Sequence, residues 1–315
     1  MAKWCFGIDL GGTTVKCALF QTDGIVEEKW EIVTRTENNG EAILPDIAAT
    51  ILAKIEEKKI DKAEVAGVGI GVPGPVEETG EIPCAVNLHW GRKNIEKELG
   101  DLTGLAVKAG NDANVAALGE MWKGGGQGAK NLILVTLGTG VGGGIIVNEK
   151  IVTGAHGAGG EIGHVTVNPS EDVVCNCDKC GCLEQYASAT GIARLAKEAL
   201  ESETEDSVLR TVKNISAKSV FDAYKEGDVL AGKIVDKFAA YLGNALAVFA
   251  CVSDPDVFVI GGGVSKAGQV LIDAVEKYYK AHAFTASKET PIKLATLGND
   301  AGIYGAAKLI LSKDN

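Results

Sequence analysis

The sequence predicts an α/β protein of two domains. Its length of 315 residues fits two domains better than one. The content of hydrophobic residues, 46%, and of charged residues, 23%, is ordinary for a globular protein with a large core. Along most of the chain, short apolar segments typical of strands alternate with longer segments typical of helices, which is the pattern of α/β folds.

The first half of the chain is rich in predicted strands. An isoleucine at every fourth position from Ile43 to Ile55 predicts an amphipathic helix, and a second helix is expected from residue 111 to about 122. Apolar runs bounded by turn residues predict strands at 4–8, 15–20, 26–34, 65–72, 106–109, 131–137 and 145–147.

The second half is predicted to be more helical. Its longest apolar run, from Phe238 to Val252, is interrupted by Gly243 and Asn244 and is too short to cross a bilayer, so it predicts a buried helix. Short strands are expected at 257–260 and 292–296. Helices are expected at 183–200, 217–225, 230–252, 302–311 and from about 267 onward.

Two glycine-rich turns repeat one arrangement. The first glycine turn (Asp9–Lys16) and the second glycine turn (Thr136–Gly140) each join two apolar runs, which predicts strand, tight turn, strand. Glycine lets the backbone approach an anion closely, and unpaired N–H groups carry partial positive charge. Two such turns suggest two lobes that bind one polyphosphate. The residues expected to contact phosphate are Gly11, Gly12, Thr13, Thr14, Lys16, Gly138, Thr139 and Gly140.

Other glycine patterns were weighed against these turns. Gly138–Gly143 also matches the dinucleotide pattern G-x-G-x-x-G, which requires a helix directly after it. The residues that follow predict a strand, so we reject that interpretation, and the P-loop pattern is absent from the sequence. Gly261, Gly262 and Gly263 end a predicted strand and leave room for a base or ribose against bare backbone.

Two aspartates are candidates for phosphoryl-transfer chemistry. Asp9 lies where a strand meets the first glycine turn. A carboxylate and a phosphate would repel each other there unless a cation such as Mg²⁺ lay between them, so we interpret Asp9 as a residue associated with Mg²⁺. The alternative is an aspartate that caps its own turn. Asp112 follows Asn111 at the start of a predicted helix, where a carboxylate stays ionised and can act as a base toward a substrate hydroxyl. The alternative is that Asn111 or Asp112 caps the helix, because asparagine and aspartate are common N-caps.

Four of the eight cysteines lie within eight residues. Close thiols in a cytosolic protein indicate a metal before a disulfide. His164 with three of these thiols, or the four thiolates without His164, would complete a tetrahedral structural zinc site. The clustered cysteines are Cys175, Cys177, Cys180 and Cys182, and those expected to be inert core residues are Cys5, Cys17, Cys84 and Cys251.

The charge balance and the N-terminal segment restrict the possible partners. The 31 basic and 42 acidic residues give a net charge of −11, which does not indicate the basic surface of a nucleic-acid-binding protein. The chain does not open with basic residues followed by an apolar segment, so no secretory signal is expected. No apolar run is long enough for a membrane span. A cytoplasmic protein with neither nucleic-acid nor membrane partners is therefore expected.

Taken together, these motifs resemble the ROK family of sugar kinases, and within it the bacterial ATP-dependent glucokinases. The resemblance implies an actin-like ATPase (ribonuclease H-like) fold, with two α/β domains around a central cleft. It implies a small domain at 1–112, rejoined by a C-terminal helix at 300–315. It also implies a large domain at 113–299, which carries the zinc site and the glycines at 261–263 that would line the nucleoside site (the nucleotide shelf). The matching segments, in family order, are 7–16, 71–75, 111–114, 136–144, 160–164, 175–184, 254–255 and 261–263.

The resemblance also implies an activity, which is transfer of the ATP γ-phosphoryl group to the 6-hydroxyl of glucose, with Mg²⁺ and with Asp112 as base. A structural zinc ion would be bound by His164, Cys175, Cys177 and Cys182. The residues that would contact sugar hydroxyls are Asn87, Asn111, Asp112, Glu161, His164 and Glu184.

Two departures and three alternatives qualify this expectation. Asp178 replaces a glycine of the family pattern, and aspartate tolerates the left-handed conformation better than most residues; Cys180 is an added thiol, expected outside the ligand set. The first alternative is a kinase for another hexose, which would be mannose, fructose, N-acetylglucosamine or N-acetylmannosamine. A sugar-responsive repressor is remote, because such relatives carry a further domain before the first turn, and an ATPase chaperone or filament would lack the zinc cluster. Family analogy implies a homodimer or homotetramer.

Overall fold

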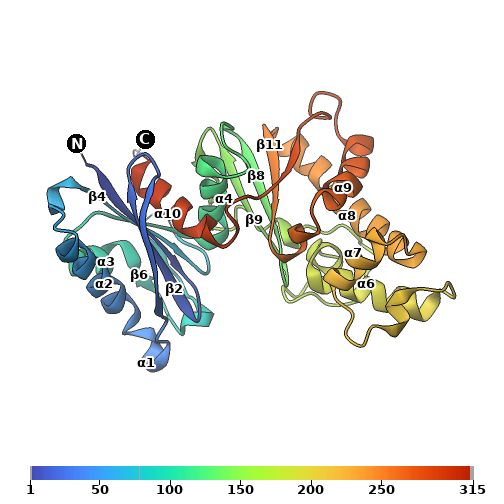
Figure 1. Cartoon of the computed structure of the whole chain (residues 1–315), viewed down its shortest axis with the longest axis horizontal. Coiled ribbons are helices and arrows are strands. Elements are labelled where there is room, and N and C mark those ends of the chain that lie inside the picture. Colours follow the sequence, from blue (N-terminus) through green and yellow to red (C-terminus); the bar gives the residue numbers. More distant parts are fainter. Residues whose placement is uncertain (1, 78, 313–315) are drawn as a thin grey trace. The chain divides into compact units, whose positions relative to one another are not determined.

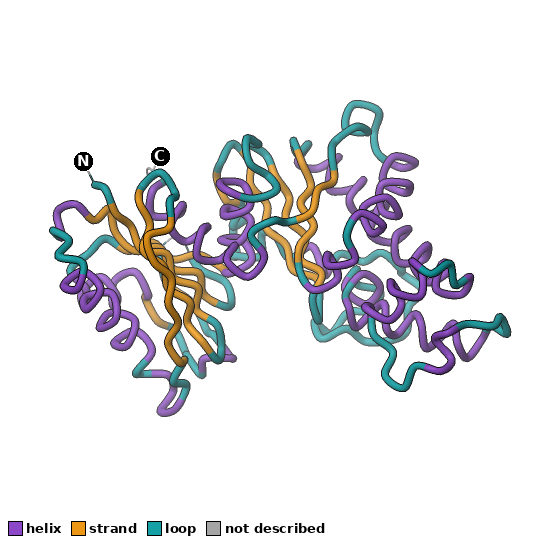
Figure 2. Tube along the Cα trace, in the orientation of Figure 1, coloured by secondary structure: helices purple, strands orange, loops and turns teal. Residues whose placement is uncertain are grey.

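The computed structural model describes residues 2–77 and 79–312. It confirms the α/β class, because two five-stranded sheets carry helices on their faces (Figures 1 and 2). By internal contacts the chain forms two compact units. The first unit comprises residues 1–128, 144–160 and 297–315, and the second comprises 129–143 and 161–296. The predicted division into domains at residue 112 stays a prediction.

The first sheet has the order β3-β2-β1-β4-β7, in which β1 runs antiparallel to β2 and parallel to β4. Its strands are β1 (Trp4–Leu10), β2 (Thr14–Gln21), β3 (Val26–Val33), β4 (Val65–Val72) and β7 (Val107–Asn111). The helices of this unit are α1 (Glu37–Gly40), α2 (Ile43–Glu57), α3 (Ile95–Thr103), α4 (Asp112–Lys123) and α10 (Ala301–Leu311), and a small pair of strands is β5 (Glu81–Ile82) with β6 (Lys93–Asn94).

Both faces of the first sheet are buried. Successive side chains of a strand point to opposite faces, so Phe6 and Ile8 of β1 join Ile51 of α2 in the larger core. Cys5 lies on the other face, against Ile303 of α10. The helix α10 packs on β1, β4 and α4 (Figure 1). The approach is so close that a Cβ on Gly69 of β4 would lie 1.7 Å from the backbone oxygen of Ala306.

A buried carboxylate joins two connecting segments of the first unit. Glu120 of α4 is 1% exposed, and its two oxygens accept hydrogen bonds from the backbone N–H groups of Gly125 (2.8 Å) and Leu297 (2.9 Å). These donors lie close in sequence to residues 128 and 297, where the chain passes between the units. Glu120 therefore stabilises both connections from inside the first unit.

We expect Glu120→Ala to destabilise the protein by about 2 kcal/mol, because two part-buried N–H groups would lose a charged acceptor. The measurement is the urea midpoint of unfolding. Glu120→Gln is the matched variant, which keeps one acceptor oxygen and should lose less stability. An alanine variant with the wild-type midpoint would contradict the assigned role.

The second sheet has the order β10-β9-β8-β11-β12, with β8 and β12 parallel to β11. Its strands are β8 (Leu132–Leu137), β9 (Val141–Val147), β10 (Lys150–Ile151), β11 (Val257–Gly261) and β12 (Ile292–Leu294). The helices of the second unit are α5 (Glu184–Ala187), α6 (Ala189–Ser202), α7 (Ala217–Lys225), α8 (Val229–Ser253) and α9 (Gln269–His282).

The long apolar helix is buried, as predicted, and α8 matches the helix expected at 230–252 to within one residue at each end. Within the described part of the chain, α8 alone is long and apolar enough to cross a membrane by length and composition. Most of it is buried, and it packs against α7 and α9, as a core helix does.

Two predictions need correction. The helix expected at 183–200 is two helices, because Ser188 leaves the helical conformation (ψ 167°) and caps α6 by accepting the N–H of Gly191. Cys5 and Cys17 are buried core thiols as predicted, and burial raises the pKa of each to about 12. Cys84 and Cys251, by contrast, are exposed, because the first lies on a surface loop and the second on the outer side of α8.

Candidate active site and metal cluster

The first glycine turn is the hairpin between β1 and β2, as predicted. The N–H of Gly11 donates to the backbone oxygen of Thr14 at 3.0 Å, which closes the turn. Asp9 and Lys16 are cross-strand partners at its base. Gly12 and Thr13 are exposed at the tip. The turn therefore presents backbone and hydroxyl groups to solvent between one carboxylate and one ammonium group.

Asp9 is a partly buried carboxylate in a charged setting. Burial raises the pKa of Asp9 above its usual value; Lys16 opposes this shift and the carboxylate of Asp112 adds to it. Lys16 Nζ lies 4.0 Å from Asp9 Oδ2, which is longer than a direct hydrogen-bonded ion pair. A divalent cation would offset the repulsion between the two carboxylates, so this donor set fits Mg²⁺.

Asp112 is the first residue of α4 and is exposed. Its Oδ1 accepts the N–H of Ala113 at 2.8 Å, which orients the carboxylate at the helix N-terminus. Asn111 is the N-cap: its side chain accepts from Ala113 and Asn114 and donates to the backbone oxygen of Gly74 at 3.0 Å. Both interpretations of this pair are thus compatible, with Asn111 serving as the cap and Asp112 left accessible.

Asn87 lies beside the first glycine turn, since its Cβ would be 3.8 Å from a Cβ placed on Gly12. It belongs to a short 3₁₀ helix, Val86–Leu88, and is exposed. Trp90, by contrast, is 5% exposed, and its ring N–H donates to the backbone oxygen of Gly40. The indole is therefore a core group of the first unit, whereas Asn87 is accessible to a ligand.

The second glycine turn joins β8 to β9, which confirms that a strand and not a helix follows Gly138–Gly143. The N–H of Gly138 donates to the backbone oxygen of Gly140 at 3.0 Å. Since β11 runs parallel to β8, with Gly261 opposite Thr136, the glycines at 261–263 lie next to this turn. The structure thus brings together the second turn and the predicted nucleotide shelf.

A cavity of about 330 Å³ adjoins the shelf within the second unit. Gly263, Val264 and Ala267 form one wall, and Ala217 and Phe221 of α7 form another. Sequence reasoning missed the α7 wall, because no pattern in residues 217–225 indicates which face of that helix meets a segment forty residues later. Apolar walls with lysines at the rim suit a flat base that carries phosphates. The rim lysines are Lys218, Lys225 and Lys266.

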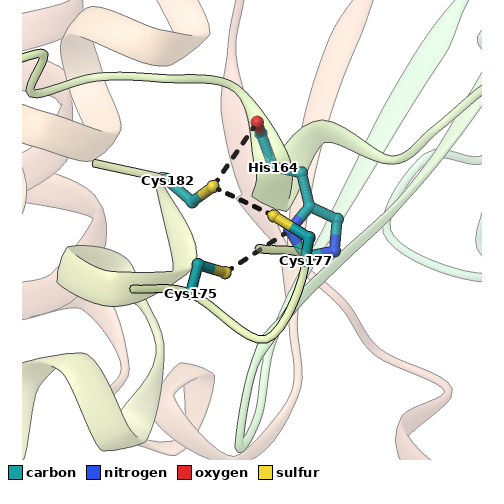
Figure 3. Close-up of side chains that lie close together, drawn as sticks. All are labelled: His164, Cys175, Cys177 and Cys182. Carbon is teal, nitrogen blue, oxygen red and sulfur yellow. Dashed lines mark hydrogen bonds between the residues drawn. The ribbon is translucent and has the colours of Figure 1, made fainter. Parts of the chain in front are cut away.

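Four side chains of the second unit form a compact group of potential metal ligands (Figure 3): His164, Cys175, Cys177 and Cys182. Their ligand atoms all lie within 4.8 Å of one another. The thiols of Cys177 and Cys182 are 3.5 Å apart, and Cys175 Sγ is 3.8 Å from His164 Nδ1. A zinc ion bonded at about 2.3 Å holds tetrahedral ligands about 3.8 Å apart. The group therefore fits such an ion.

Local turns place these ligands. The N–H of Cys175 donates to the backbone oxygen of Lys179 at 2.7 Å, and Asp178 within this turn has the left-handed conformation expected of it (φ 65°). Cys180 points elsewhere, with its Sγ 3.8 Å from the backbone oxygen of Asp172. Cys182 directly precedes Leu183 and the start of α5.

A carboxylate lies on either side of His164, and that of Glu184 links this cluster to the second glycine turn. His164 directs Nδ1 toward the thiols and Nε2 toward Glu161 Oε2, at 3.9 Å. Glu184 Oε1 accepts from the thiol of Cys175 at 2.9 Å, and its Oε2 would lie 2.6 Å from a Cβ on Gly140. Two carboxylates thus lie beside the imidazole of His164.

The residues that carry these features follow one another as they do in a known family. A model of the ROK family matches residues 5–313 of the chain. The chain belongs to the ROK family. This confirms the predicted resemblance and, with it, the two-sheet α/β architecture as the actin-like ATPase fold of ROK kinases.

Named ROK relatives are similar over almost their whole lengths. The glucokinase of Halalkalibacterium halodurans is 44% identical over 99% of this chain and 96% of that protein. The glucokinase of Thermotoga maritima is 37% identical over 96% of both. The structure of a ROK family glucokinase from Streptomyces griseus in complex with glucose and AMPPNP is 33% identical, with a TM-score of 0.73 over 97% of this chain and 98% of that one.

Proposed function

We propose that this ROK protein is an ATP-dependent glucokinase, which transfers the γ-phosphoryl group of ATP to the 6-hydroxyl of glucose. The observation that carries the proposal is the near full-length similarity to two glucokinases and to the glucokinase structure with glucose and AMPPNP. The accessible carboxylate at the start of α4 supports it, because phosphoryl transfer to a hydroxyl needs a base.

Asp112 is the proposed base. The N–H of Ala113 orients its carboxylate at the helix N-terminus, where the carboxylate would accept the hydroxyl proton. A weak base suffices, because the transition state of phosphoryl transfer is loose and the proton leaves late. Asn111, next to Asp112 in the sequence, and Asn87, beside the first glycine turn, would hold the sugar in line for the transfer.

The two glycine turns are the proposed phosphate-binding elements. Their backbone N–H groups, the hydroxyls of Thr13, Thr14 and Thr139, and the ammonium group of Lys16 would bind phosphate oxygens. Mg²⁺ near Asp9 would neutralise charge on the transferred group. The cavity beside Gly261–Gly263 is the proposed site for adenine and ribose.

The group of potential metal ligands is the proposed site of a structural zinc ion. Bound through Nδ1, His164 would have a fixed ring and tautomer, so its Nε2 would be aimed at a sugar hydroxyl together with Glu161. Glu184, beside both Cys175 and the second turn, would bind another hydroxyl. Cysteines that are not joined in disulfides, and a proposed thiolate–metal site, support a reducing, cytoplasmic location. A homodimer or homotetramer stays a prediction.

The test is ADP release with Mg²⁺ and ATP across glucose, mannose, fructose, N-acetylglucosamine and N-acetylmannosamine. We expect kcat/KM to be highest for glucose, because unpaired polar groups in a hydroxyl-binding site penalise the wrong sugar. A preference for an N-acetyl sugar would contradict the substrate and leave the kinase reaction intact. ADP release with none of the sugars would contradict the proposed function.

A further inference from the structure

The Asp9 carboxylate lies against the first turn of the C-terminal helix α10. A Cβ placed on Gly302 would lie 2.5 Å from Asp9 Cγ, and 2.7 and 2.9 Å from its two oxygens. These three atoms are the nearest neighbours of that position in the described structure. Residue 302 therefore sets how much room the carboxylate has, and glycine gives it the most.

The same C-terminal segment restrains the other charge of the first glycine turn. Lys16 Nζ donates to the backbone oxygen of Asn299 at 2.9 Å, while it stays 4.0 Å from Asp9 Oδ2. A lysine that faces an aspartate across a hairpin would ordinarily close to a direct ion pair. The carbonyl of Asn299 competes for the ammonium group, which leaves the carboxylate oxygens accessible for other partners.

We propose that residues 299–302 form a positioning element for the magnesium–nucleotide complex. Gly302 leaves room for the Asp9 carboxylate, and the Asn299 carbonyl holds the Lys16 ammonium group away from that carboxylate. Asp9 can then act on Mg²⁺ while Lys16 binds phosphate oxygens. Gly302 touches neither substrate nor metal in this arrangement and acts through Asp9. The inference rests on the proposed function, because it assigns Asp9 to magnesium and phosphate.

Gly302→Ala perturbs this element selectively. The three atoms nearest to the added methyl group all belong to the end of the Asp9 side chain, which can rotate away, and alanine has a higher helix propensity than glycine. The fold should therefore survive. Gly305→Ala in the same helix differs, because its Cβ would lie 1.6 Å from the backbone oxygen of Val115. The matched control is Gly232→Ala in α8, where the Cβ would meet Tyr224 Cδ2 at 3.9 Å, an ordinary contact.

The experiment measures binding by calorimetry in the full-length protein, with AMPPNP in Mg²⁺, with AMPPNP in EDTA, and with glucose. We expect Gly302→Ala to weaken AMPPNP binding about tenfold in Mg²⁺ and less than about twofold in EDTA, and to leave glucose affinity within about twofold. Gly232→Ala should match the wild type in all three titrations.

A double-mutant cycle with Asp9→Ala then tests the route of the effect. If Gly302 acts through Asp9, adding Gly302→Ala to Asp9→Ala changes Mg²⁺-dependent affinity by less than about twofold. An equal loss in both backgrounds, or no loss in either, overturns the proposal. A wild-type protein that binds AMPPNP in a Mg²⁺-dependent way but does not phosphorylate glucose would overturn the proposed function and leave this inference standing.

Discussion

Asp112→Asn should lower kcat for glucose phosphorylation by about 10²- to 10⁴-fold, because the variant keeps the size of the side chain but not its basicity. The amide oxygen can still accept the N–H of Ala113, which the carboxylate accepts at 2.8 Å, so the start of α4 should be preserved. Glucose and AMPPNP affinities should therefore stay close to wild type. The measurements are steady-state kcat and the two dissociation constants.

The matched control is Asp61→Asn, which makes the same change at another exposed residue whose side chain accepts a backbone N–H, that of Ala63 at 2.9 Å. It should leave kcat unchanged. An Asp112→Asn protein within a few-fold of wild-type kcat would refute the role of base. A variant that keeps kcat but loses glucose affinity would show that Asp112 binds the sugar and does not accept its proton.

Cys182→Ser is expected to abolish zinc binding, whereas Cys180→Ser keeps about one zinc ion per chain. The two thiols are two residues apart, but Cys182 is fully buried and 3.5 Å from Cys177 Sγ, while Cys180 points to the backbone oxygen of Asp172. Metal content by mass spectrometry of purified protein measures the difference.

Loss of the ion should also weaken the second unit, because three buried or half-buried thiols and an imidazole would lose their common partner. Cys182→Ser should therefore unfold at a lower temperature and bind glucose more weakly, since His164 loses its anchor. Zinc loss in Cys180→Ser would show that the ligand set is a four-thiolate site or an exchange between thiols. Zinc retained in Cys182→Ser would contradict the proposed ligands.

Features made by contiguous residues could be predicted from the sequence. The hairpin at Asp9–Lys16, the helix at 43–57 and the strand after Gly140 follow from local periodicity and turn chemistry. Helix α3 at 95–103 was missed, because in nine residues it buries just Ile95, Leu99 and Thr103, too few for a clear period. Its N-cap Asn94 was the available signal.

Features made by distant segments could not be predicted from the residues alone. Nothing in the local sequence of α7 indicates that Phe221 shares a cavity with Gly263, and nothing near residue 302 indicates that it borders Asp9. Both depend on which faces of the elements meet after packing. The cysteine cluster lies between these cases: spacing indicates four candidate thiols, but the direction of Cys180 away from the other three depends on the turn through Asp178.

The place of α10 in the first unit has a consequence for the order of synthesis. Residues 129–143 and 161–296 of the second unit all leave the ribosome before residue 301, where α10 begins. Until then Gly69 of β4 lacks the helix that covers it. The unit that contains β1 is thus completed after the second unit, the reverse of the usual progression of domain folding along the chain.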